Sequence, residues 1–221
     1  MKDRTGLIAA CVLGVLMLPL VILLLVPKGN GGTYAKIESK LLPAVVEFNR
    51  QDSLELRLTA TDGDGESVIR REHLWLSGED WLQETVLKTE TGETTILTLR
   101  YDGKLYRSKN GDERYTSDIM DHINFRIDPA QVVFRSWERQ WNGAYTTFGM
   151  SETTQNEQSL GFYSKSETYE VDWRQNLRQV KTVMFGIDKT PKQVSVLEIL
   201  SVDEKSCRSQ IETAYADWKV P

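Results

Sequence analysis

The chain has 221 residues, with 27 lysines and arginines against 32 aspartates and glutamates, so its formal net charge is −5 at pH 7. Beyond residue 32 it is long enough for one domain, which would bury roughly 70% of its unfolded surface. An acidic domain repels phosphate backbones and anionic lipid surfaces, and we therefore expect no nucleic-acid partner.

The first predicted element is residues 6–26, an apolar run without a charged side chain. As a helix rising about 1.5 Å per residue, it is long enough to cross a hydrocarbon core of about 30 Å. Lys2 and Arg4 precede the run, and these positive charges favour a protein of the cell membrane whose N-terminus lies in the cytoplasm. We expect a cytoplasmic tail (1–5), an uncleaved single-pass transmembrane helix (6–26), a linker (27–33) and an extracytoplasmic domain (34–221).

Two alternatives for the apolar run stay open. A cleaved secretory signal would have a shorter apolar region, of about 7–15 residues, although the glycines after residue 28 would permit cleavage. A lipoprotein signal is suggested by Cys11, but the apolar run continues well past that cysteine, whereas such a signal ends near it. With Cys11 in the run, Cys207 has no intrachain partner within reach, and we expect a buried thiol without a disulfide.

The domain is expected to begin with a helix and continue as a meander of strands. Ile37, Leu41, Val45 and Phe48 recur at helical spacing, with Pro43 inside the helix as a kink. Alternating polar and apolar residues predict half-buried strands over residues 54–60 and 95–101. Two strand-like runs of mixed pattern, 68–76 and 81–87, lie between them, and 105–106 resumes the sheet after an Asp-Gly turn and before an Asn-Gly turn.

The middle of the domain is predicted to be helical, starting at Asp128-Pro129. Val133, Trp137 and Trp141 follow at i, i+4 and i+8, and Phe134 widens this apolar face. The face either packs on the sheet as core or lines an apolar ligand cavity. We expect a packed face with at most a small cavity, and keep these four residues as the candidate ligand site.

The last third of the chain returns to strands and closes with a helix. Strands are expected over residues 144–150, 169–173, 177–185 and 194–202. Cys207, Ile211, Tyr215 and Trp218 then form the apolar stripe of a C-terminal helix, capped by Asp203. The predicted fold class is α+β: an N-terminal transmembrane helix, then a curved antiparallel sheet (a half-barrel-like meander) covered by helices.

Motifs for catalysis or metal binding are missing from the sequence. His73 and His122 have no companion ligands at zinc-site spacing. An EF-hand loop starting at Asp62 fails because its sixth and twelfth places hold Ser67 and His73. No nucleophile elbow, phosphate-binding loop or dinucleotide fingerprint occurs. We expect no enzyme, no catalytic residue, no metal and no cofactor.

Two hairpins suggest a family resemblance, one running from Trp81-Leu82 through Asp102-Gly103 to Tyr106, the other from Tyr169 to Phe185. With the order of helix, meander, middle helices and further strands, the chain resembles the LolA-like half-barrels of lipoprotein carriers. The resemblance implies a curved sheet whose concave face is covered by helices and holds acyl chains. The chain departs from those carriers, which are soluble or lipid-anchored, in its apolar N-terminal run and in its C-terminal helix.

Two functions follow as expectations. The first is a membrane-anchored, extracytoplasmic, non-catalytic binding module that scaffolds or senses within a bacterial envelope assembly, with a protein as its partner. The alternative is a binding or carrier domain for a lipid or a lipoprotein acyl chain. A membrane anchor favours the first slightly, because a carrier that shuttles has to diffuse.

Overall fold

The structure is a computed structural model that describes residues 37–111, 113–117, 125–129, 138–141, 145–153 and 164–219. The predicted tail, transmembrane helix and linker (residues 1–33) lie outside the described residues. Within the described ranges, no helix is both long and apolar enough to cross a membrane.

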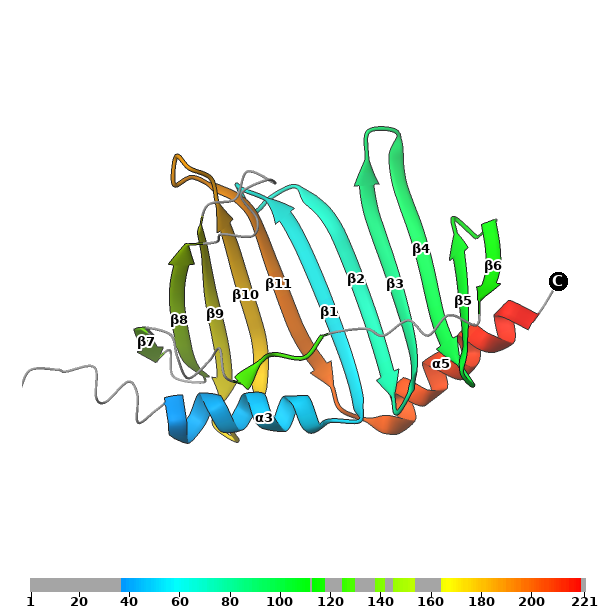
Figure 1. Cartoon of the computed structure of the whole chain (residues 1–221), viewed down its shortest axis with the longest axis horizontal. Coiled ribbons are helices and arrows are strands. Elements are labelled where there is room, and N and C mark those ends of the chain that lie inside the picture. Colours follow the sequence, from blue (N-terminus) through cyan, green and yellow to red (C-terminus); the bar gives the residue numbers. More distant parts are fainter. Residues whose placement is uncertain are drawn as a thin grey trace, which may run out of the picture. The chain divides into compact units, whose positions relative to one another are not determined.

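The described residues form one antiparallel sheet of eleven strands in the order β6-β5-β4-β3-β2-β1-β11-β10-β9-β8-β7 (Figure 1). Strands β1 to β6 make one up-and-down meander and β7 to β11 a second, and the pairing of β1 with β11 joins the two. The strands are β1 (Ser53–Asp62), β2 (Val68–Ser77), β3 (Asp80–Thr89), β4 (Gly92–Tyr101), β5 (Lys104–Lys109), β6 (Glu113–Ser117), β7 (Glu138–Trp141), β8 (Tyr145–Thr153), β9 (Ser164–Asp172), β10 (Leu177–Phe185) and β11 (Pro191–Ser201).

The predicted turns set the register of the first meander. Asp102 and Gly103 join β4 to β5 with φ angles of 50° and 73°, the left-handed conformation that a two-residue hairpin turn requires. Asn110 and Gly111 adopt similar angles, 52° and 81°, between β5 and β6. Both predicted turns are confirmed, and a two-residue turn fixes the register of the two strands that it joins.

The first helical segment packs on one side of the sheet. A π-helical turn, η1 (Ile37–Leu41), leads into α3 (Leu42–Arg50), with Pro43 in the first turn of α3. The predicted irregularity at this proline is therefore present as the change from π- to α-helix. Figure 1 shows α3 lying across the lower ends of β9, β10 and β11. We name this side of the sheet the α3 face; its buried residues include Ala44, Val45, Phe48, Leu54, Leu56, Leu74, Leu76, Val180 and Ile199.

The C-terminal helix packs on the opposite side of the sheet. Helix α5 (Glu204–Lys219) begins as predicted, because the Asp203 carboxylate accepts a hydrogen bond of 3.0 Å from the Ser206 backbone N–H. Its residue Ile211 packs against Leu82 and Leu99, the core of what we name the α5 face. Successive side chains of a strand point to opposite faces, so neighbouring residues along one strand serve two separate cores.

The predicted α+β fold class is wrong. The described residues are mostly sheet, with η1–α3 and α5 as their only long helical segments, so helices do not cover the sheet as expected. The predicted middle helix does not reach Trp141, because residues 138–141 are strand β7, which pairs with β8. Pairing with a neighbouring strand overrides a helical spacing of aromatic residues, which a strand can also carry. The fold-class prediction also included a transmembrane helix, and that helix lies outside the described residues.

Candidate binding cavity

A cavity of about 360 Å³ lies on the α3 face, over the seam between β1 and β11. Leu58 on β1 and Leu197 on β11 are register partners, so their side chains meet across the seam. Leu56 precedes on the same face, and Leu74 is its partner on β2. The floor of the cavity is therefore a sheet of four leucines contributed by three neighbouring strands.

The cavity is covered on one side by Phe125, which belongs to a segment (residues 125–129) distant in sequence from the floor. The Asn49 side chain donates a hydrogen bond of 2.6 Å to the Ile127 carbonyl and accepts one of 3.1 Å from the Ile127 N–H. The Phe125 ring packs edge-on against Phe48 of α3, with ring centroids 6.2 Å apart, and lines the cavity. A single asparagine thus fixes the segment that holds Phe125 over the leucine floor.

The remaining wall of the cavity is polar. The Arg70 guanidinium donates twice to one carboxylate oxygen of Glu72, and the Thr85 hydroxyl donates to the same oxygen at 3.3 Å. The Glu72 side chain is only 12% exposed, whereas that of Arg70 is 49% exposed. Gln83, the partner of Leu74 on β3, completes this wall. A largely buried carboxylate beside an apolar floor is stable here because it is paired and hydrogen-bonded.

This arrangement suits a ligand with an apolar chain and a polar end. The volume lies within the range of small-molecule sites, roughly 300–1,000 Å³, which are mostly apolar with a few placed polar groups. An apolar chain would displace water from the leucine floor, at about 25 cal/mol for each Å² removed from water. The polar end would lie near Arg70, which keeps half of its side chain in solvent.

The structure does not test the ligand face predicted from the sequence. Val133, Phe134 and Trp137 lie outside the described residues, and Trp141 is described only as part of the backbone of β7. The cavity instead uses residues from the two sides of the β1–β11 seam. The alternation of Leu54, Leu56 and Leu58 marks the floor in the sequence, but no local pattern indicates which segment covers it.

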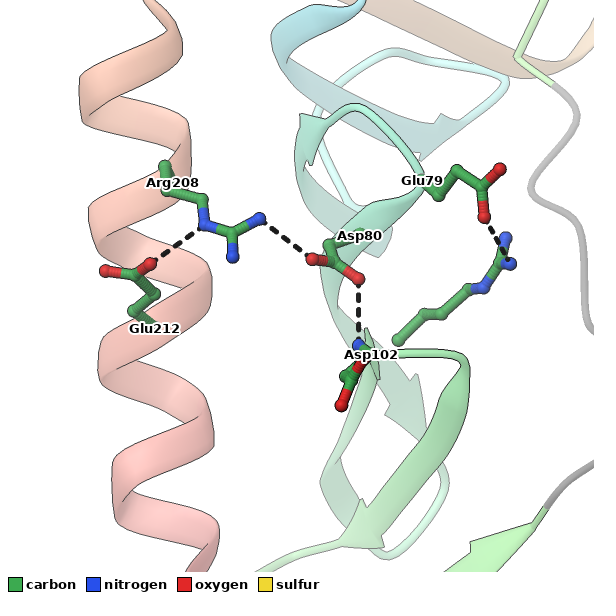
Figure 2. A network of polar contacts seen from close by, with 6 residues as sticks. Glu79, Asp80, Asp102, Arg208 and Glu212 are labelled. Atoms are coloured by element: carbon green, nitrogen blue, oxygen red, sulfur yellow. Dashed lines mark hydrogen bonds and ion pairs between the residues drawn. The ribbon is translucent and has the colours of Figure 1, made fainter.

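A second group of ionisable residues lies on the α5 side and serves to hold that helix (Figure 2). Arg208 of α5 donates to Asp80 at 2.8 Å and to Glu212 at 2.8 Å, and the second oxygen of Asp80 accepts the Asp102 backbone N–H at 3.0 Å. The hydrogen bond to Glu212, together with the nearby Asp80, raises the pKa of Arg208 above its ordinary value. The network ties α5 to two hairpin turns, and every member is already paired, so we assign it a structural role.

Histidine and metal chemistry have little support in the described ranges. His73 accepts or donates a hydrogen bond of 2.9 Å with Glu55 and stacks on Trp75, with ring centroids 3.7 Å apart. No three histidine, cysteine, aspartate or glutamate side chains among the described residues come together as a metal site. His122 lies outside those residues.

Comparison of the chain with protein-family models and with curated proteins finds no match. The cavity and its lining are therefore the direct basis for a functional proposal.

Proposed function

We propose that this domain is a non-catalytic binding module whose ligand is an amphiphile with its apolar chain on the leucine floor of the cavity. The observation that carries the proposal is the partly covered hollow between Leu58, Leu197 and Phe125, where a close-packed core would leave no such space. The resemblance to lipoprotein-carrier half-barrels supports the same ligand class, as an analogy of fold.

The pairing of Arg70 with Glu72 supports an anionic polar end on the ligand. Arg70 can turn part of its guanidinium towards a ligand carboxylate or phosphate while it keeps one hydrogen bond to Glu72, because the group has five N–H donors. The charge pattern of residues 2–28 supports the further proposal that the domain is held at a membrane on the extracytoplasmic side.

The test is photocrosslinking of a diazirine-bearing fatty acid to the full chain, purified in lipid nanodiscs, with the crosslinked peptides located by mass spectrometry. We expect crosslinks in the peptides that contain Phe125, β1 and β11. Leu197→Trp fills the cavity and should lower crosslinking at these peptides by about tenfold, which corresponds to about 1.4 kcal/mol of binding free energy.

Val196→Trp is the matched control, because Val196 is the sequence neighbour of Leu197 on the opposite face of β11. The control should crosslink as the parent protein does. Crosslinks confined to residues 6–26, or equal loss in both variants, would refute an amphiphile site in this cavity.

A further inference from the structure

The turn between β9 and β10 is built around one buried carboxylate. Asp172 accepts hydrogen bonds from the backbone N–H groups of Arg174 at 2.9 Å and of Asn176 at 2.8 Å. Its other oxygen accepts from the Arg178 guanidinium at 2.8 Å and from the Asn176 side chain at 3.2 Å. These bonds fix the path of the backbone through residues 173–176.

This rigid turn presents a large aromatic side chain to solvent. Trp173 is 76% exposed, which makes it the most exposed large hydrophobic residue among those described. The guanidinium carbon of Arg174 lies 4.6 Å from the centre of the Trp173 ring, so the two side chains form a cation–π stack. In the described part of the chain Arg174 has no carboxylate partner, in contrast to Arg178, which is paired with Asp172.

A second cavity, of about 260 Å³, opens beside this stack. Its apolar lining comes from α3, the start of β1 and the neighbouring strands, and Arg174 stands at its rim. Glu47 of α3 also lines the cavity, and one of its carboxylate oxygens accepts a hydrogen bond of 2.6 Å from the Gln51 side chain. The apolar lining residues are Ala44, Phe48, Leu54, Leu177, Ile199 and Val202.

We propose that the Trp173–Arg174 stack and this cavity form a docking site for a protein segment in which an acidic residue neighbours a large apolar residue. The apolar side chain enters the cavity, and the carboxylate pairs with the guanidinium of Arg174. The site is separate from the amphiphile cavity, because the two have no lining residue in common.

Three observations favour a protein segment over a lipid chain at this site. The cavity is small enough to be filled by one or two side chains. Tryptophan and arginine are the residues most enriched at the centres of protein interfaces, where a few anchors supply most of the binding energy. Trp173 also adds a flat apolar surface outside the cavity, held in place by the Asp172 turn, so little conformational freedom is lost on binding.

The experiment selects binders from a random peptide display library on the full chain in nanodiscs. We expect the enriched peptides to carry Asp or Glu next to Leu, Ile, Phe or Met. The affinity of a selected synthetic peptide should fall about tenfold or more in Trp173→Ala and in Arg174→Glu, the loss typical of interface anchors. Arg174→Gln, which removes the charge without reversing it, should lose less than Arg174→Glu.

A charge exchange separates pairing from misfolding. A peptide whose acidic residue is changed to Lys should bind Arg174→Glu better than the parent protein does. Lys181→Glu is the matched control, since it makes the same change of charge on an exposed residue of β10 away from the cavity, and it should bind the original peptide normally.

Failure of this site is distinguishable from failure of the amphiphile site. Leu197→Trp fills only the cavity over the β1–β11 seam and should leave peptide affinity unchanged. Selected peptides without the acidic–apolar pair, or with equal affinity for parent, Trp173→Ala and Arg174→Glu, would overturn the proposal. Full competition between anionic vesicles and the peptide would also overturn the proposal, because it would indicate that Arg174 binds a membrane surface.

Discussion

Asp172 is a buried residue whose charge should make stability sensitive to acid. Burial raises the pKa of its carboxyl, but the hydrogen bonds from Asn176 and Arg178 outweigh burial and hold the pKa below the ordinary value of 3.8. A group whose pKa is lower in the folded state contributes stability above its unfolded value and loses that contribution as pH falls through the folded one.

Asp172→Asn should therefore destabilise the domain by about 1–3 kcal/mol at pH 7, because buried donors lose their charged acceptor. The difference between variant and parent should be constant down to about pH 4 and shrink below it. Urea unfolding midpoints measured between pH 2.5 and pH 7 check this. A difference that stays the same at every pH would show that the carboxylate charge is not what stabilises the turn.

Burial of the Cys207 thiol leads to a second prediction about stability. The sequence prediction of a buried thiol is confirmed, since the side chain is fully buried in α5, and within the described residues Cys207 is a free cysteine. Burial, with a smaller effect of the nearby Glu55, raises the pKa of the thiol, so little of the reactive thiolate forms at neutral pH. Cys207→Ser should cost about 1–3 kcal/mol, from a buried hydroxyl and lost apolar contact.

Thiol labelling measures the same burial independently. The native protein should react with a maleimide far more slowly at Cys207 than at a cysteine introduced by Ser209→Cys on the exposed side of the helix. Equal labelling rates would mean that α5 leaves the sheet frequently in the native state.

At the scale of elements, α5 depends on polar contacts as well as on Ile211. Asp80 connects Arg208 of the helix to the backbone of the β4–β5 turn (Figure 2). Its side chain is 16% exposed, so water replaces these contacts poorly. The aromatic residues Tyr101 and Tyr215 stack beside the network, with ring centroids 4.2 Å apart.

Asp80→Ala should lower the free energy of unfolding by about 1–2 kcal/mol and increase hydrogen exchange in α5. Glu79→Ala is the matched control: Glu79 is the neighbouring residue in the same turn, but its partner Arg100 points to the face of β4 opposite to Leu99 and α5, so this change should leave hydrogen exchange in α5 unaltered. Equal exchange in the two variants would contradict an anchoring role for Asp80.

The elements also show how far the sequence predicted the fold. Strand β10 has the predicted limits, residues 177–185, because its alternation and its turns are local signals. The alternation predicts a strand through Trp173, but Asp172 accepts the backbone N–H groups of Arg174 and Asn176, and β9 ends at Asp172. Trp141 was predicted in a helix and lies in β7, because strand pairing is a tertiary interaction that a helical spacing does not reveal.

The candidate cavity was predictable only in part. Two leucines of its floor, Leu56 and Leu58, follow from the alternation of β1. Its cover depends on the contact between Asn49 and Ile127, which are 78 positions apart, and no local pattern encodes that contact. The same limit applies to the pairing of β1 with β11, which brings Leu58 to Leu197.

At the scale of the whole sheet, the β1–β11 seam makes two meanders into one cooperative unit. Thr59 lies in the middle of β1 and pairs with Arg71 on one side and with Val196 on the other. The apolar core of the α3 face extends across the seam, from Leu76 on β2 to Val180 on β10. Neither meander can therefore bury its share of this core without the other.

Thr59→Pro should unfold both meanders together, because proline removes a ladder hydrogen bond and cannot be accommodated in a central strand. Hydrogen exchange followed by mass spectrometry should show faster exchange in β2–β3 and, to the same degree, in β9–β10. Thr116→Pro in the edge strand β6 is the control, and it should raise exchange only in β5 and β6. Faster exchange in β2–β3 with β9–β10 still protected would contradict the single unit. In that case the amphiphile cavity would be divided between two meanders that separate in solution. Added fatty acid should then fail to slow hydrogen exchange in either meander.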